Sequence, residues 1–332
     1  MPTIFLSFKA SARDRYYGDK ALRALGELGE VRLNDSNFAL DGQALIDAAQ
    51  GCQVIVSDRQ TPAPAALFDA CPQLAAVLRC AVDIRNIDVA AASAAGVLVT
   101  HASAGFTTAV AEWVLGAMID LSRGISDSVL AYRAGQAPAI VMGRELQGAT
   151  LGVIGYGQIG RRVAALGVAL GMRVVVSDPL MRVADAGIEQ LELDALLAQA
   201  DHVVCLAPAR PETENLMNAA RFAQMKAGGF FINASRGDLV DEAALLQALD
   251  GGHLAGCAMD VGRAPDQMPS PALAGHARVI ATPHIGGLTP PAVEHQALET
   301  VAQLRELVSG RMPTGAVNAA QARRLALLRA AP

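Results

Sequence analysis

The sequence predicts an α/β protein built on parallel sheets, and three observations support this. Short aliphatic runs alternate with segments of helical spacing along most of the chain. Hydrophobic residues make up 52% of the sequence and aromatic residues only 4%, and small aliphatic side chains suit strands covered by helices on both faces. A chain of 332 residues is too long for one compact core, so we expect two domains.

The first hundred residues contain five expected strands, separated by Pro, Gly and Asp. Leu22, Leu25 and Leu28 recur at helical spacing and predict a helix over residues 20–28. The expected strands are residues 4–8, 31–33, 54–56, 75–78 and 97–100.

An apolar helix is expected at residues 107–121, followed by a polar arm and a second alternating series. Six parallel strands are enough for a complete doubly wound sheet. Residues 293–308 then read as a final helix and residues 323–332 as a frayed tail. The strands of the second series are expected at residues 151–154, 173–177, 202–206, 229–233, 254–259 and 279–281.

The composition excludes several classes of protein. The net charge is −5 and no basic face is visible, which argues against a nucleic-acid partner. The five cysteines are scattered without a CxxC motif, so neither a disulfide framework nor a metal site is expected. We read no signal peptide and no apolar stretch that could cross a membrane, and expect a cytoplasmic protein. The cysteines are Cys52, Cys71, Cys80, Cys205 and Cys257.

A glycine-rich motif follows the expected strand 151–154 and opens a helix over residues 161–170. Gly155 permits a sharp turn, Gly157 allows close approach of a pyrophosphate, and Gly160 lets the helix pack on the strand. Backbone N–H groups at the helix start, at Gln158 and Ile159, would face the phosphates. This context predicts a dinucleotide-binding Rossmann sheet.

The next expected strand ends in Asp178-Pro179. An acid at this place accepts both ribose hydroxyls and repels a 2′-phosphate, so NAD is favoured over NADP. A flavin is the alternative cofactor, but flavin-binding motifs of this kind usually lie near a chain's start and this one lies mid-chain. A substrate domain built from both ends of the chain is therefore expected.

Three further segments place reactive side chains at strand ends. Arg236 follows residues 229–233 and matches a carboxylate in bidentate fashion. Asp260 follows the next strand, and His284 follows the last one, stiffened by Pro283. The remaining histidines lack such a context and are interpreted as structural: His101, His202, His253, His276 and His295.

These residues, in this order, resemble the D-isomer-specific 2-hydroxyacid dehydrogenases, of the phosphoglycerate dehydrogenase or glyoxylate–hydroxypyruvate reductase type. The resemblance covers nearly the whole chain. It implies that Arg236 holds the substrate carboxylate and that His284 exchanges a proton with the carbonyl oxygen. It also implies cofactor contacts at Asp260, Ala234 and Ser235, at Ala207, Pro208 and Thr213, and at the glycines after His284, Gly286 and Gly287. Residues 79–89 resemble the substrate loop; its substrate-binding turn reads Cys80-Ala81-Val82 here, in which the backbone amides of Ala81 and Val82 would hold a carboxylate.

The chain departs from the family pattern at one catalytic position. The family carries a Glu five residues after Asp260 that orients the histidine, and Pro265 stands there in this sequence. Gly262 likewise replaces a usual aromatic residue. Either Asp266 supplies the carboxylate, with Gln267 as a neutral alternative, or His284 works without a carboxylate. In the second case its pKa would lie near the ordinary value of ~6.5.

We therefore predict a Rossmann-type domain over residues 102–287, inserted into a flavodoxin-like substrate domain of residues 1–101 plus 288–332. The expected function is NAD-dependent interconversion of a 2-keto acid and a D-2-hydroxy acid. The alternative, motivated by Pro265, is a non-catalytic NAD-binding regulator on the same fold. The arm after Leu121 resembles the family's dimerisation region and predicts a homodimer.

Overall fold

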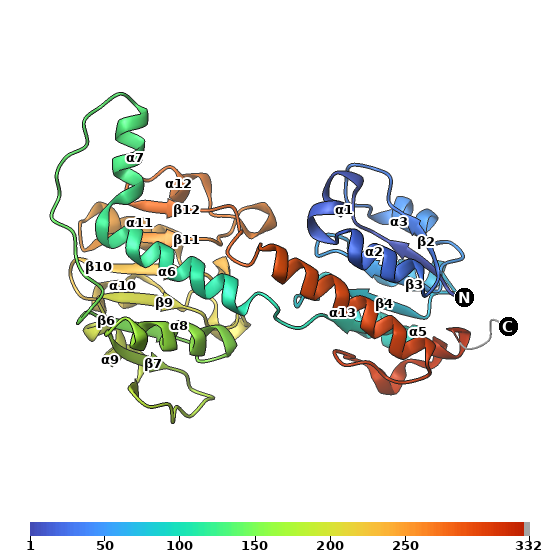
Figure 1. Ribbon diagram of the computed structural model, residues 1–332. Helices are drawn as coiled ribbons and strands as arrows, with labels where there is room; N and C mark the ends of the chain where they lie inside the picture. Colours follow the sequence, from blue (N-terminus) through green and yellow to red (C-terminus); the bar gives the residue numbers. More distant parts are fainter. Residues whose placement is uncertain (329–332) are drawn as a thin grey trace. The chain divides into compact units, whose positions relative to one another are not determined.

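The computed structural model describes residues 1–328. The chain divides into two compact units, which are described separately (Figure 1). Unit 1 comprises Met1–Phe106 together with the chain from Thr289 onward, and unit 2 comprises Thr107–Leu288. The predicted borders, after residues 101 and 287, lie a few residues before these.

Unit 1 is built on a five-stranded sheet in which every pairing is parallel. Its order, β2-β1-β3-β4-β5, is the flavodoxin-like order, so the predicted fold class is confirmed for this part of the chain. The expected strands lie within two residues of the observed ones. These are β1 (Thr3–Leu6), β2 (Glu30–Leu33), β3 (Val54–Ser57), β4 (Ala76–Arg79) and β5 (Leu98–His101).

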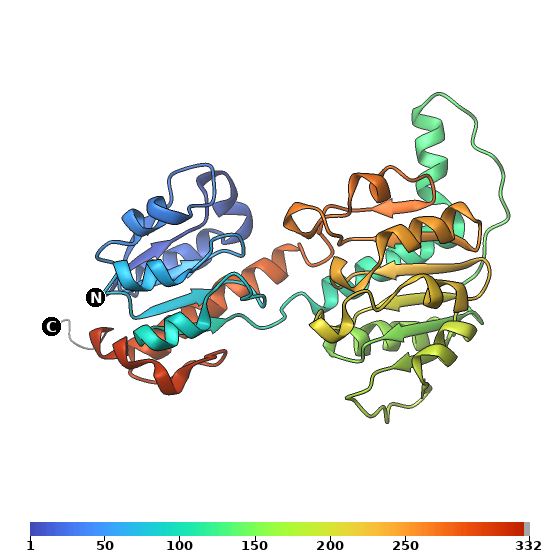
Figure 2. The same cartoon turned by 180° about the vertical axis from the view of Figure 1, so that it is seen from behind.

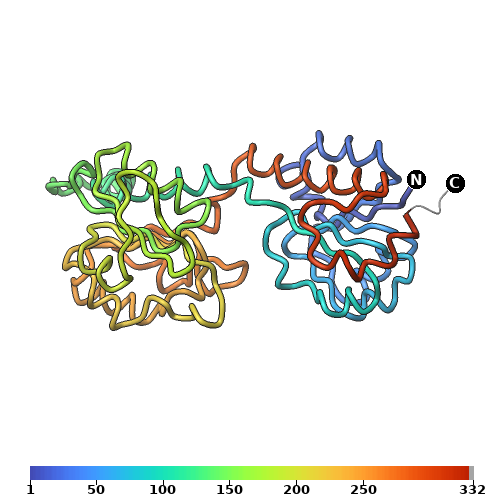
Figure 3. Tube along the Cα trace, turned by 90° about the horizontal axis from the view of Figure 1, so that it is seen from below, coloured from blue at the N-terminus to red at the C-terminus, as the bar shows by residue number. Residues whose placement is uncertain are grey.

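Helices cover both faces of this sheet, because its strands are apolar on both sides. One core joins the N-terminal helices to the final helix; Figure 3 shows these segments side by side as the blue and red parts of the trace. Its members include Leu25 and Leu304, and the Tyr17 hydroxyl lies 3.1 Å from the Thr300 hydroxyl. The helices on this face are α1 (Ala10–Tyr16), α2 (Asp19–Gly26) and α13 (Pro290–Val308); those on the other are α3 (Gly42–Ala49), α4 (Ala65–Ala70) and α5 (Val89–Ala95).

The chain after α13 covers the edge strand β5. Buried Asn318 accepts a hydrogen bond from the Val99 N–H at 2.8 Å and donates to the Val97 carbonyl at 2.9 Å. The short helices Ala319–Gln321 and Arg323–Leu328 follow, and Leu328 is buried in the core. The expectation of a frayed tail is therefore wrong for residues 323–328, and its last part, residues 329–332, lies outside the described residues.

Unit 2 is built on a seven-stranded parallel sheet of order β12-β11-β10-β9-β6-β7-β8. This is the doubly wound Rossmann order with one added strand, and it reverses between β6 and β9. Six strands match the prediction, and β8 was missed. The strands are β6 (Thr150–Ile154), β7 (Arg173–Ser177), β8 (Ile188–Gln190), β9 (His202–Cys205), β10 (Gly229–Asn233), β11 (Leu254–Met259) and β12 (Val279–Ala281).

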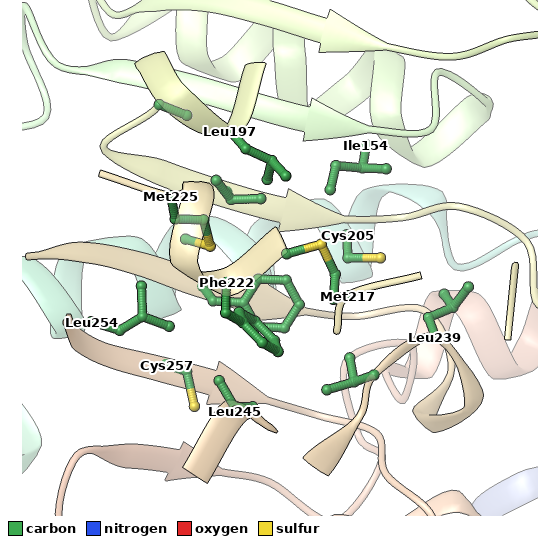
Figure 4. Packing of buried hydrophobic residues seen from close by; sticks show 14 of the residues in the cluster. Ile154, Leu197, Cys205, Met217, Phe222, Met225, Leu239, Leu245, Leu254 and Cys257 are labelled. Carbon is green, nitrogen blue, oxygen red and sulfur yellow. The ribbon is translucent and has the colours of Figure 1, made fainter. Parts of the chain in front are cut away.

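Two hydrophobic cores hold the helices of unit 2 against its sheet. Helices α6 (Thr107–Arg123) and α8 (Gln158–Ala169) cover one face (Figure 1). The other face carries α9 (Leu193–Gln199), α10 (Ala219–Gln224) and α11 (Glu242–Asp250) (Figure 2). In this second core Phe222 meets Phe231 edge to face at 5.3 Å, among the aliphatic and sulfur-containing side chains of Figure 4. This packing fixes where the strands end, and with them the loops of the site.

Helix α7 (Ile125–Arg133) and the loop after it project from unit 2 (Figure 1). None of the residues of α7 is buried. Among the described residues, no helix has the length and apolar character needed to cross a bilayer. All five cysteines are free and buried.

Candidate active site

The predicted cofactor and catalytic residues of unit 2 follow the carboxyl ends of its strands. Gly155 follows β6, Asp178 follows β7, and Ala207 lies two residues beyond β9. Asp260 follows β11 directly, and Arg236 and His284 each lie three residues beyond their strands, β10 and β12. Because all these strands are parallel, the residues lie at one edge of the sheet, where ligands bind in open α/β folds.

The glycine turn has the geometry that a pyrophosphate requires. Gly155 has a φ of +95°, and a Cβ there would lie 2.7 Å from the Ala207 nitrogen. A Cβ on Gly160 would lie 2.1 Å from the Gly155 carbonyl oxygen, so the helix can approach the turn only with glycine there. A Cβ on Gly157 would meet no atom within 4 Å. The backbone at Gly157 therefore faces open space at the start of α8, and the predicted residues Gln158 and Ile159 form the first turn of that helix.

Asp178 is held directly beside the glycine turn. One carboxylate oxygen accepts a hydrogen bond from the Tyr156 N–H at 2.7 Å. The other accepts from the N–H groups of Leu180 and Met181, at 2.9 Å and 3.0 Å. These bonds fix the carboxylate at the end of β7, next to Pro179, where the adenosine ribose of a dinucleotide would lie.

The loops after β9 and β10 are joined by a side chain. The Ser235 hydroxyl donates a hydrogen bond to the Ala207 carbonyl at 2.6 Å. Thr213 closes its own loop, because its hydroxyl donates to the Pro208 carbonyl at 2.8 Å. Ala234 packs partly buried against the core. The structure therefore brings these predicted residues together on the path a cofactor would follow.

Arg236 is placed by a buried asparagine to which the sequence reasoning gave no role. The Asn233 amide donates to the Arg236 carbonyl at 2.9 Å, and its oxygen accepts from the Ser235 N–H at 3.0 Å. The half-buried Arg236 guanidinium donates to the Ser235 carbonyl at 2.7 Å. An asparagine at a strand end, where its amide can bridge a turn, was the signal that could have indicated this role.

The buried Asp260 carboxylate organises the turn that carries His284. It accepts hydrogen bonds from the Thr282 hydroxyl at 2.6 Å and from the N–H groups of Ile285 at 2.8 Å and Gly286 at 2.7 Å. A Cβ on Gly286 would lie 2.7 Å from this carboxylate, so the turn closes on Asp260 only with glycine there. Gly287 continues the same turn.

The ring of His284 contacts the loop in which Pro265 replaces the family's glutamate. Its Nδ1 lies 3.2 Å from the main-chain carbonyl oxygen of Asp266. Its backbone N–H donates to the Asp260 carbonyl at 2.9 Å, and its φ is 54°. This hydrogen bond uses the backbone of Asp266, whereas the sequence predicted its carboxylate as the partner.

The predicted carboxylate-binding turn lies in unit 1, after β4. Cys80 is buried, which raises the pKa of its thiol, and the Ala81 carbonyl accepts a hydrogen bond from the Ala102 N–H at 3.0 Å. Val82 is 37% exposed. Arg85 forms an ion pair with Asp83 at 2.9 Å, so it is engaged within its own turn.

Arg79 lies beneath the same turn and is fully buried. Burial lowers the pKa of its guanidinium to about 10, against the opposing charges of Asp58 and Asp83. It donates to the Thr61 carbonyl at 3.1 Å and to the side chain of Asn86. Arg79 therefore anchors the loop rather than facing solvent. Within residues 1–328, no group of three or more His, Cys, Asp or Glu side chains is placed to hold a metal ion.

Comparison with known proteins agrees with this arrangement. Residues 115–286 match the model for the NAD binding domain of D-isomer specific 2-hydroxyacid dehydrogenases. The chain is 36% identical to D-3-phosphoglycerate dehydrogenase of Rattus norvegicus over 285 residues, which cover 84% of this chain and 53% of that protein. The protein of the same name from Mycobacterium bovis is 36% identical over 300 residues, 89% of this chain and 56% of that protein. The chain thus spans about half the length of these curated relatives.

A solved structure agrees over nearly the full length of both chains. The TT0316 protein from Thermus thermophilus is 30% identical and superimposes with a TM-score of 0.86, covering 95% of this chain and 99% of that one. The match to the family model extends over more than half of the chain. The chain therefore belongs to the D-isomer specific 2-hydroxyacid dehydrogenase family and carries its NAD binding domain.

Proposed function

We propose that the chain is an NAD-dependent oxidoreductase that interconverts a 2-keto acid and a D-2-hydroxy acid. One observation carries the proposal: Arg236 and His284 each follow the carboxyl end of a strand in the same parallel sheet. Their strands, β10 and β12, flank β11, and Asp260 at the end of β11 holds the His284 turn. A carboxylate-binding side chain and a proton-exchanging side chain thus share one edge with the glycine turn.

The residues divide the reaction between them. When bound, the cofactor supplies or accepts the hydride at the substrate carbon. The planar guanidinium of Arg236 binds the substrate carboxylate and polarises the adjacent carbonyl oxygen. His284 donates its Nε2 proton to that oxygen during reduction and removes it during oxidation. In unit 1 the N–H groups of Ala81 and Val82 suit a carboxylate, whereas the Cys80 N–H donates to the Ser57 carbonyl at 2.9 Å.

The glycine turn, Asp178 and the loops at Ala207 and Ser235 would hold the cofactor. The open space at Gly157 suits the pyrophosphate, and the negative charge of Asp178 favours NAD over NADP. The family has a glycine-rich turn where this chain has residues 80–82, and here the half-exposed Val82 side chain takes up space that glycine would leave open. We therefore expect small 2-keto acids to react better than bulky ones.

The decisive experiment is NADH oxidation, followed by absorbance, against a panel of 2-keto acids. Glyoxylate, pyruvate, hydroxypyruvate, 2-ketobutyrate and phenylpyruvate span the sizes of interest, and D-3-phosphoglycerate, suggested by the name of the relatives, tests the reverse direction. Turnover should fall by about 10²–10⁴ in His284→Ala, the usual contribution of a general acid–base. Arg236→Lys should chiefly raise KM, because an ammonium cannot form the bidentate pair.

The second candidate function is a non-catalytic NAD-binding regulator, which the proline at position 265 favours. It predicts that NADH binds, measured by quenching of the chain's one tryptophan, while no acid of the panel is reduced. Turnover that depends on His284 would eliminate it.

We propose that the protein forms a homodimer through its arm, which consists of α7 and the loop that follows it. Its apolar side chains are unusually exposed: Leu130 is 62% exposed, Tyr132 69%, Ile140 104% and Met142 95%. Such a surface suits a partner copy. Sedimentation of Leu130→Glu against wild type tests this, and an unchanged mass would contradict the arm as interface.

Free buried cysteines suit a reducing compartment, and we propose the cytoplasm, which cell fractionation would test.

A further inference from the structure

Three of the four non-glycine residues with positive φ in the described part of the chain are His284 itself, Asp266, which contacts its ring, and the next residue, Gln267. The non-glycine residues with positive φ in residues 1–328 are Asn215 (φ 51°), Asp266 (φ 58°), Gln267 (φ 58°) and His284 (φ 54°). Such conformations are costly for side-chain-bearing residues and tend to occur at functional sites. All four belong to one connected set of loops in unit 2. We propose that this set is a positioning device, in which the main-chain carbonyl of Asp266 orients His284 in place of the family's glutamate.

The inference deepens the proposed function and rests on it for its catalytic meaning. A histidine that donates from Nδ1 to a fixed acceptor keeps its Nε2 available to the substrate. The Asp266 carbonyl is such an acceptor, 3.2 Å from Nδ1. A carbonyl orients the ring by its dipole but brings no full charge.

The loop that bears this carbonyl is clamped by Arg263, which the sequence reasoning did not single out. Its Nη2 lies within hydrogen-bond distance of three acceptors on two neighbouring loops. One of them is the strained Asn215, whose side-chain oxygen is 2.7 Å away. The other two are the Glu214 carboxylate at 2.8 Å and the Asp238 carbonyl at 2.9 Å, and the Nε donates to the Val240 carbonyl at 3.2 Å. Arg263 thus ties residues 262–267 to the rest of the sheet edge.

The backbone around Gly262 leaves no room for the aromatic side chain that the family usually carries at this position. A Cβ on Gly262 would lie 2.5 Å from the Pro269 Cα, and a Cβ on Gly237 would lie 2.2 Å from the Gly262 carbonyl. The two glycine backbones therefore touch, directly beside Arg236. The Gly262 N–H donates to the Gln267 carbonyl at 2.8 Å, which closes the turn. The two departures from the family, at 262 and at 265, thus belong to one rebuilt loop.

A pair of substitutions at Asp266 separates the backbone from the carboxylate. Asp266→Asn removes the charge but tolerates the left-handed conformation, so the carbonyl stays in place. Asp266→Val also removes the charge, but a β-branched residue strongly disfavours this φ, so the carbonyl moves. Asp266 is exposed, and circular dichroism and melting curves would verify that both variants fold.

The measurement is the tautomer of His284, read by nitrogen-15 NMR of histidine-labelled protein and assigned with His284→Gln. We expect the proton on Nδ1 in wild type and Asp266→Asn, and a several-fold fall of that form in Asp266→Val and in Arg263→Gln. The inference would be overturned if Asp266→Asn and Asp266→Val changed the tautomer population equally, or if the proton lay chiefly on Nε2 in wild type. The readout needs no turnover, so an inactive protein with the expected tautomers would refute only the proposed function.

Discussion

Low pH should destabilise unit 2 through a buried histidine that does not belong to the candidate active site. His202, the first residue of β9, is 1% exposed. Its Nε2 lies 2.9 Å from the Ser122 hydroxyl, and its ring is 5.1 Å from that of Phe230. Its Nδ1 has no hydrogen-bond partner among the described residues. Burial lowers the pKa of His202 to about 4 from 6.5, and the neighbouring Asp201 only partly opposes this.

The size of the effect follows from the two pKa values. The unfolded chain binds a proton below about 6.5, whereas the folded protein resists it down to about 4. The contribution of His202 is therefore complete above pH 6.5 and is lost as the pH falls towards 4. Between pH 8 and pH 5 the free energy of unfolding should fall by about 2 kcal/mol from this group alone.

Urea unfolding of wild type and His202→Gln at pH 8 and pH 5 measures this loss. The chain's one tryptophan, Trp113, lies in unit 2, so its fluorescence follows the unit that contains His202. We expect the difference between the two pH values to shrink by about 2 kcal/mol in the variant. His276→Gln, which removes a less buried histidine of the same unit, should retain the full difference. Equal pH dependence in wild type and His202→Gln would refute the reasoning.

Three further substitutions test the site and the fold. Gly157→Ala should fold normally, because its Cβ meets open space, yet bind NADH at least tenfold more weakly in a fluorescence titration. Gly160→Ala should lower the free energy of unfolding by about 1–3 kcal/mol, because its Cβ would lie 2.1 Å from the Gly155 carbonyl; an unchanged melting curve would contradict this. Asn318→Ala removes the bonds to β5 and should cost about 1–3 kcal/mol, measured by urea unfolding followed by circular dichroism.

Strand positions could be read from the sequence wherever a strand is buried on both faces. The bounds of β7 and β10 were predicted to the residue, because aliphatic or aromatic runs there are closed by Asp178 and by the segment Ala234-Ser235-Arg236. Strand β8 was missed, since Ile188–Gln190 is only three residues long and mostly exposed. So short a strand carries too little apolar pattern to be recognised in this way, whereas the edge strands β2, β5 and β12 were recognised.

The candidate site was predictable where it depends on side chains at strand ends. Gly155, Asp178, Arg236, Asp260 and His284 lie on one sheet edge as the motif spacing predicted. The hydrogen bond in which the Asp266 carbonyl accepts from the His284 ring could not be predicted, because every residue has a backbone carbonyl and its direction depends on φ and ψ. The sequence left Asp266, Gln267 or no partner at all as alternatives for His284, and the contact at 3.2 Å is made by the Asp266 main-chain carbonyl.

The interleaved construction of unit 1 affects how the protein can be made in the cell. Residues 107–288 form their own unit from one continuous segment, so they can fold on the ribosome as soon as they emerge. Asn318, which covers the edge of β5, is synthesised more than two hundred residues after that strand. An uncovered strand edge promotes aggregation. We expect ribosome-bound chains that end at residue 310 to require a chaperone, whereas chains that have released residue 328 do not. Comparing the protease resistance of the two arrested chains would show whether unit 1 stays unprotected until the segment that covers β5 has been released.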